Sequence, residues 1–200
     1  MLQAVRRSKG WLLAAVLVTL ATTLVAPPTS SAQPVPVPKC TDSYTLRYCV
    51  AYLANEEYSN DDGHKYEKPL GSNCNYFTAH VSAPGASDCG NGYRSEEWCM
   101  DFSKWVYRIE GAAVTNLNNL AFSAKNYPTY KSYASGRRPK LGDLAVWAHE
   151  SHVGIVVSVS GSNATVVSGN SWNPARGDYT AIYKKSYPAS TFQGFAGPKF

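Results

Sequence analysis

The chain has 200 residues, 44% hydrophobic and 16% charged, which suits one ordinary globular domain that buries a core. The 19 Lys and Arg residues outnumber the 14 Asp and Glu by five, and Arg6, Arg7 and Lys9 lie in the N-terminal segment. Without those three bases the charge is 5 − 3 = +2, which is too mild to indicate a nucleic-acid partner.

The N-terminal segment has the pattern of a secretory signal peptide. Its basic residues precede an apolar run from Trp11 to Val25, and Ser30 and Ala32 are the small residues that signal peptidase requires. We therefore expect residues 1–32 to be a signal peptide that is cleaved after Ala32. The apolar run is shorter than the roughly 20 residues of a membrane span, so no stable membrane association is expected after cleavage. The general and the twin-arginine export routes both stay open.

The mature chain is expected to begin with a spacer. Residues 33–39 read QPVPVPK, and alternating prolines favour an extended segment that packs poorly. The folded domain is then expected to span residues 40–200. We expect a secreted, extracellular monomer.

The cysteines supply the first functional clue. An exported protein meets an oxidising environment, where cysteines pair, and an odd count leaves at least one thiol. The chain has five: Cys40, Cys49, Cys74, Cys89 and Cys99. Pairing Cys40 with Cys49 and Cys74 with Cys89 closes two short loops and leaves Cys99 free. We predict these two disulfides.

The first half of the domain is predicted to be helical. Apolar spacing without a breaker predicts a helix over residues 47–58, and the polar residues 59–73 read as a loop. Residues 74–92 read as a second connection. A helix over residues 95–110 is predicted with Ser95 as its N-cap.

The second half reads as short strands bounded by turn residues. The strand candidates, rich in Val and Ile, are residues 143–147, 152–159, 164–170 and 179–187. Helices followed by an antiparallel meander indicate an α+β fold.

Cys99 and His152 are the candidate nucleophile and base. Cys99 is expected in the second turn of its helix, near the positive end of the dipole, where a thiol is easier to ionise. If the loop around Gly161–Asn163 has three or five residues, His152 stands opposite Asn170 on one face of the hairpin, with Ser168 beside them. The valines and the isoleucine between residues 153 and 159 then share the other, buried face. A two-residue loop would instead place Ser171 opposite His152.

An Asn beside a His can complete a catalytic triad. Its amide oxygen accepts the imidazole N–H and fixes the tautomer, as in cysteine proteases that use Cys, His and Asn. We therefore name Cys99, His152 and Asn170 as catalytic candidates. The spacing alone also fits an inert buried cysteine and a structural histidine.

Five segments of the chain resemble the CHAP family, the cysteine- and histidine-dependent amidohydrolases and peptidases. They are residues 95–106 (SEEWCMDFSKWV), 139–147 (PKLGDLAVW), 152–159 (HVGIVVSV), 169–171 (GNS) and 194–198 (GFAGP). The resemblance covers roughly residue 74 to the C-terminus. It implies a papain-like α+β fold, with N-terminal helices packed against a small antiparallel sheet.

The resemblance also implies an activity. Family members cleave peptidoglycan as N-acetylmuramoyl-L-alanine amidases or cross-bridge endopeptidases, and Cys99, His152 and Asn170 match the nucleophile, the base and the last polar residue. One position departs from the pattern: Ser168 stands where many members carry an acid. No cofactor or metal is implied, and the expected partner is peptidoglycan or another peptide-containing wall polymer.

Two other functions stay open on the sequence. One is a catalytically inactive, secreted wall-binding module of the same fold, and the other is a thiol peptidase that acts on protein. Aromatic residues are candidates to line a substrate groove: Tyr127, Tyr130, Tyr133, Trp147 and Trp172.

Overall fold

The computed structural model describes residues 46–61, 65–81, 85–90, 92–118, 120–149, 151–174 and 177–200. They all belong to one compact unit of the chain. The predicted signal peptide, the proline-rich spacer and Cys40 lie outside the described residues, so only the Cys49 end of the predicted Cys40–Cys49 bridge is described. Within the described ranges, no helix has the length and apolar character needed to cross a membrane.

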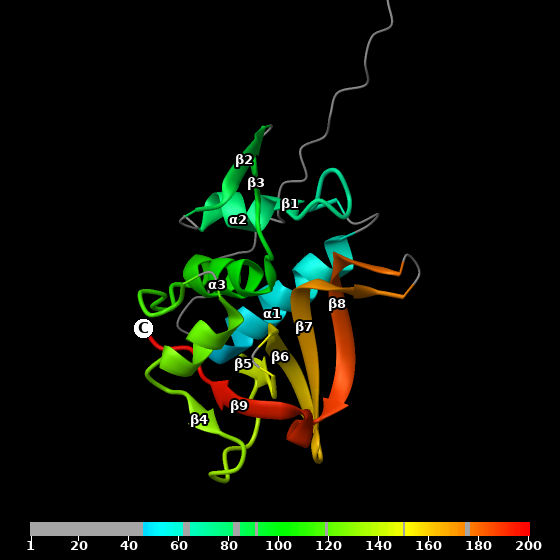
Figure 1. Ribbon diagram of the computed structural model, residues 1–200. Helices are drawn as coiled ribbons and strands as arrows, with labels where there is room; N and C mark the ends of the chain where they lie inside the picture. Colours follow the sequence, from blue (N-terminus) through cyan, green and yellow to red (C-terminus); the bar gives the residue numbers. More distant parts are fainter. Residues whose placement is uncertain are drawn as a thin grey trace, which may run out of the picture. The chain divides into compact units, whose positions relative to one another are not determined.

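Helices and two antiparallel sheets build the fold, and the predicted α+β class is confirmed (Figure 1). The helices are α1 (Leu46–Asn60), α2 (Tyr76–His80) and α3 (Cys99–Ile109), with 3-10 turns η1 (Ala121–Asn126) and η2 (Ala189–Thr191). The small sheet has the order β1-β3-β2, with β1 (Cys74–Asn75), β2 (Ser87–Gly90) and β3 (Tyr93–Ser95). The large sheet has the order β4-β9-β5-β6-β7-β8, with β4 (Lys131–Ser132), β5 (Leu144–Trp147), β6 (Val153–Ser160), β7 (Asn163–Asn173), β8 (Asp178–Pro188) and β9 (Phe192–Ala196).

Two helices cover one side of the large sheet. Helix α1 confirms the helix predicted over residues 47–58, and both α1 and α3 pack against β6 and β7 (Figure 1). An ion pair joins α1 to the residue just before β5, because the buried Asp143 accepts from Arg47 of α1; it also accepts from Arg137 at 2.7 Å. The four predicted strands of the second half are confirmed as β5 to β8.

The connection predicted over residues 74–92 is wrong, because this segment carries structure of its own. It contains β1, α2 and β2, and the two strands pair with β3 in the small sheet. The predicted disulfide between Cys74 and Cys89 is confirmed, and it joins β1 to β2 across that sheet. Asn75 caps α2 by accepting from the backbone N–H of Thr78 at 2.8 Å.

The start of α3 differs from the prediction. Ser95 is not an N-cap but the last residue of β3, where it pairs with Cys74 of β1 and Ser87 of β2. The helix begins at Cys99 with Trp98 as its N-cap residue, and no side chain caps it. Pairing in the small sheet has therefore overridden the local preference of Ser95 for a helix start, and Cys99 is the first helical residue instead of a second-turn residue.

The β6–β7 hairpin corrects the predicted turn length but, beyond a bulge, keeps the predicted register. Ser160 pairs with Asn163, so the turn has two residues instead of three or five. A bulge at Val157 then shifts the register, so that Val156 faces Val166 and Ile155 faces Val167. The predicted buried face therefore holds at Val153 and Ile155, which are fully buried, but ends before Val159, which is 43% exposed. A bulge has this effect because it inserts one residue into the alternation of the strand.

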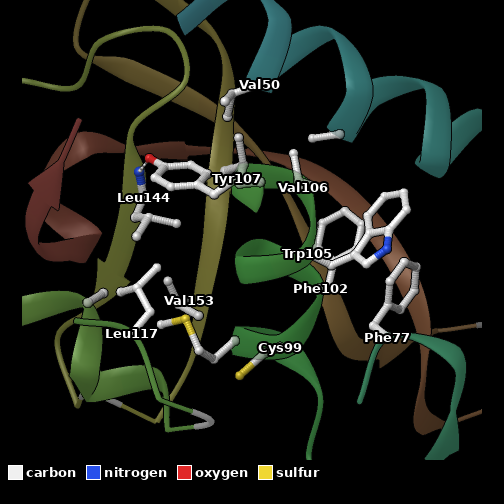
Figure 2. Close-up of a cluster of buried hydrophobic side chains, with 14 of the residues drawn as sticks. Val50, Phe77, Cys99, Phe102, Trp105, Val106, Tyr107, Leu117, Leu144 and Val153 are labelled. Carbon is white, nitrogen blue, oxygen red and sulfur yellow. Dashed lines mark hydrogen bonds between the residues drawn. The ribbon is translucent and has the colours of Figure 1, made fainter. Parts of the chain in front are cut away.

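The core lies between α1, α3 and the large sheet. Figure 2 shows its aromatic and aliphatic side chains, with Cys99 at the start of α3 and Tyr107 at the other end of the helix. Tyr107 donates its hydroxyl to the carbonyl of Gly142 at 2.8 Å and accepts from the amide of Leu144 at 3.1 Å. A second cluster, which includes Val156, Val166, Phe192 and Phe195, covers the opposite face. Tyr107 thereby fixes the C-terminal part of α3 to the start of β5.

Candidate active site

Cys99 is a free thiol at the N-terminus of α3 and is only 5% exposed. It lies on the wall of a cavity of about 980 Å³, and His152, Asn170 and Ser171 line the same cavity. Cys99 also borders a second cavity of about 350 Å³, whose walls include Glu96, Glu97 and Phe122. Cys99 is therefore a residue that the two cavities share.

The residue before Cys99 is fixed by a buried carboxylate that the sequence analysis missed. Trp98 is fully buried and donates its indole N–H to Glu67 Oε2 at 3.1 Å. The other oxygen of Glu67 accepts from the backbone N–H of Asn73 at 2.8 Å. Glu67 thus ties the segment before β1 to the start of α3. No local signal marks it, since its partners lie 6 and 31 residues away in the sequence.

His152 immediately precedes β6 and is held from two sides. Its ring packs edge-on against Trp147, with the centroids 4.9 Å apart and the planes at 68°. Its Nε2 lies 3.2 Å from Ser171 Oγ. The backbone N–H of the next residue, Val153, reaches the thiol of Cys99 as a hydrogen-bond donor. The chain thereby brings His152 and Cys99 to one cavity wall.

Asn170, the predicted partner of the imidazole, is not the residue that contacts it in the described structure. Asn170 lines the cavity and is 8% exposed, and its Oδ1 has no hydrogen-bond partner. Ser171 stands at His152 Nε2 instead, and Ser168 Oγ lies 2.6 Å from Ser171 Oγ. Ser168, the position of the departure from the family pattern, therefore reaches His152 through Ser171.

Burial sets the protonation states of the candidate pair. It raises the pKa of the Cys99 thiol to about 12, although backbone N–H groups of Val153 and Met100 oppose that shift. Burial also lowers the pKa of His152 to about 4. Both shifts disfavour the charged form of each group. At neutral pH the pair rests as a thiol and a neutral imidazole.

The aromatic lining differs in part from the prediction. Trp147 and Trp172 border the large cavity, as do Tyr179 and Tyr187. Trp172 and Tyr179 are 47% and 59% exposed and contact each other with ring centroids 5.3 Å apart. Tyr127, Tyr130 and Tyr133 pack instead in the hydrophobic clusters, where Tyr127 donates to the carbonyl of Ala113 at 2.8 Å.

This arrangement has the parts that nucleophilic catalysis requires. A thiol at a helix N-terminus, a neutral imidazole in the same cavity and a hydrogen-bonded group behind that imidazole form the nucleophile–base–orienter pattern. The backbone N–H groups of the first helical turn, which have no partner within the helix, supply positive potential where an oxyanion would form.

Comparison with known proteins gives a match to one family model over part of the chain. The CHAP domain model matches residues 88–170, a segment that contains Cys99, His152 and Asn170. Comparisons with curated proteins and with solved structures found no match. A CHAP domain implies an amidase or peptidase of the kind that hydrolyses peptidoglycan, on a papain-like fold, which confirms the resemblance read from the sequence.

Proposed function

We propose that this chain, a member of the CHAP family, is a secreted cysteine hydrolase that cleaves amide bonds of peptidoglycan. One observation carries the proposal: the free thiol of Cys99 and the imidazole of His152 line the same cavity at the start of α3. The predicted signal peptide over residues 1–32 supports export to the cell wall, where the polymer would be the partner.

Cys99 acts as the nucleophile in the proposed reaction. Its sulfur attacks the carbonyl carbon of the scissile amide while its proton passes to His152, since the two groups rest in their neutral forms. The imidazolium then gives that proton to the departing amine, and a thioester of Cys99 remains. Water, deprotonated by His152, hydrolyses the thioester and regenerates the thiol.

The start of α3 provides the electrostatic part of the proposed mechanism. The carbonyl oxygen becomes negative in the tetrahedral intermediate and would lie at the positive end of the helix dipole. The backbone N–H of Cys99, at the first helical position, is the donor that we assign to it. The burial that keeps the resting pair neutral also keeps water away and strengthens this interaction.

Substrate would lie along both cavities that Cys99 borders. The larger one, about 980 Å³, has exposed aromatic rings at Trp172 and Tyr179, and the smaller one, about 350 Å³, has the carboxylates of Glu96 and Glu97. Two cavities that share Cys99 suit a chain-like substrate that continues on both sides of the scissile bond. An N-acetylmuramoyl-L-alanine amidase and a cross-bridge endopeptidase both need this arrangement.

Mass spectrometry of muropeptides tests the proposal. Purified walls are digested with the parent protein and with Cys99→Ala, and the new termini name the bond. A free amino group on L-Ala, released from the lactoyl group of the sugar, indicates the amidase. A new amino group within the cross-bridge indicates the endopeptidase. If walls bind the protein but release no fragments, the protein is an inactive binding module. If it cleaves only denatured protein substrates, it is a peptidase that acts on protein.

A further inference from the structure

We propose that Ser171, supported by Ser168, positions His152 and fixes its tautomer, and that the amide of Asn170 is left to bind substrate. The catalytic meaning of this inference rests on the proposed function. It reverses the roles expected from the sequence, in which Asn170 orients the ring. Ser171 is here a positioning residue, because it acts through His152.

The hydrogen bonds around Ser171 determine which ring nitrogen carries the proton. Ser171 Oγ lies 3.1 Å from the carbonyl oxygen of Ser168 and 3.4 Å from that of Gly169. A carbonyl can only accept, so the Ser171 hydroxyl proton points toward these oxygens. The lone pairs of Ser171 Oγ are then free to accept from His152 Nε2, 3.2 Å away.

Ser168 completes the arrangement. Its Oγ lies 2.6 Å from Ser171 Oγ, and with the Ser171 proton directed to a carbonyl, Ser168 is the donor of that bond. Both hydroxyls are then satisfied, and His152 carries its proton on Nε2. The lone pair of Nδ1 remains available as the base for Cys99. A hydroxyl that was free to rotate would not select between the two tautomers.

An irregularity in β7 turns Ser171 toward the ring. Ser168 pairs with Tyr183 and Ser171 with Ala181, so Gly169 and Asn170 together face the single residue Ile182 of β8. Asn170 adopts φ +48°, the left-handed conformation that Asn tolerates better than most residues. Such bulges redirect side chains next to functional sites.

The same irregularity places Asn170 on the wall of the cavity. Its side chain is nine-tenths buried, yet Oδ1 has no partner. A buried polar atom without a partner costs free energy that a bound ligand recovers. A peptide N–H of the substrate is the matching donor, because the cavity that Asn170 lines also contains Cys99.

Nitrogen NMR of His152 tests the positioning role without any activity measurement. We expect the parent protein at pH 7 to show a protonated Nε2 and an unprotonated Nδ1. Ser171→Ala should give a mixture of tautomers, while Asn170→Ala, one residue away, should keep the Nε2–H form. Ser171→Thr, which retains the hydroxyl, should keep it too. A parent protein with the proton on Nδ1, or an Asn170→Ala protein that loses the Nε2–H form, overturns the inference, and neither result depends on whether Ser171→Ala folds.

Steady-state kinetics on soluble muropeptides separates the two roles. Ser171→Ala should lower kcat about 10- to 100-fold, less than the loss of a charged triad member, and leave KM within about twofold. Asn170→Ala should raise KM about tenfold, the equivalent of one lost hydrogen bond. The reverse pattern overturns the inference. A parent protein without hydrolase activity would contradict the proposed function and, with it, the binding role of Asn170. The NMR result would still decide the role of Ser171, because it does not depend on activity.

Discussion

A β-carbon added to Gly169 would stand 2.6 Å from Cζ3 of Trp98 and 2.7 Å from Cβ of Phe102. Strand β7 therefore lies directly against the start of α3, at a distance that only a glycine permits. This contact brings the irregular part of β7, with Asn170 and Ser171, to the end of the helix where Cys99 lies. Packing at Gly169 thus connects the proposed nucleophile, Cys99, to the residues behind the proposed base, His152.

Gly169→Ala should destabilise the protein and disturb the site. The added methyl overlaps the Trp98 ring, and overpacking in a well-packed core costs about 1–3 kcal/mol. Urea unfolding measures the change in the free energy of unfolding, with Ser160→Ala, at an exposed position of β6, as the control. Unfolding free energies that agree for Gly169→Ala and the parent would show that β7 can move away from α3 at no cost.

Cys99→Ala and His152→Ala should each remove nearly all wall-lytic activity. Members of a catalytic unit are not additive, so each single loss should approach the double loss, on the order of 10⁴–10⁶ in rate. The measurement is the fall in turbidity of purified walls, with circular dichroism to show that each variant is folded. His149→Ala is the matched control, since this exposed histidine lies three residues from His152. A folded Cys99→Ala protein that clears walls at the parental rate would exclude the thiol mechanism.

The pH dependence of alkylation should reveal a neutral resting pair. Burial raises the pKa of Cys99 to about 12, so its thiolate fraction grows about tenfold for each pH unit across the neutral range. The rate of Cys99 modification by iodoacetamide, followed by peptide mapping, should therefore rise from about pH 6 to pH 9 without a plateau. His152→Ala should keep this profile. A plateau that begins near pH 5 and disappears in His152→Ala would instead indicate a preformed ion pair.

Hydrolysis should fail at low pH for the same reason. Burial lowers the pKa of His152 to about 4, and only the neutral imidazole can accept the thiol proton. Hydrolysis should thus persist as the pH falls below the ordinary histidine value of 6.5 and decline as it passes through about 4. Initial rates on walls, at pH values where the protein remains folded by circular dichroism, measure this. A decline centred near pH 6.5 would mean that His152 is well solvated.

Asp101→Asn should stabilise the protein at alkaline pH. Burial and the neighbouring Glu96 raise the pKa of Asp101 to about 8, and Asp101 Oδ2 accepts from Thr78 Oγ1 at 2.6 Å. A carboxyl whose pKa is raised in the folded protein does not lower the stability while it is protonated in both the folded and the unfolded chain. The free energy of unfolding then falls as the pH rises from 3.8 through about 8, because the folded state resists losing that proton. Asn keeps the acceptor without the charge, so at pH 9 its advantage should exceed the ~1.4 kcal/mol of one pKa unit.

Urea unfolding at two pH values checks the Asp101 prediction. The stability gained by Asp101→Asn relative to the parent should be larger at about pH 9 than at about pH 5, because the Asp101 carboxyl of the folded parent is charged only at the higher pH. Glu97→Gln, an exposed carboxylate on the same segment, should change stability little at either pH. An Asp101→Asn protein that is less stable than the parent at both pH values would mean that the carboxylate is a stabilising ionised group.

Much of the site could be read from the sequence, because its signals are local. The apolar spacing from Trp98 to Ile109 predicted the α3 helix, and the runs of Val and Ile predicted β6 and β7. Cysteine counting identified Cys99 as the free thiol and paired Cys74 with Cys89, as the described structure has them. Each of these inferences needed only neighbours in the chain or a short loop.

The tertiary structure decided the details on which the chemistry depends. Ser95 lies in β3 instead of capping α3, because pairing with Cys74 and Ser87 outweighs its local preference. The irregularity at Gly169 and Asn170 changes which polar side chain meets His152. Strand alternation predicts such contacts only in a regular ladder, and a bulge is set by the packing of neighbouring strands and helices. Local signals in the sequence therefore indicate the candidate nucleophile, the candidate base and the fold class, whereas packing between distant segments places Ser171 behind His152.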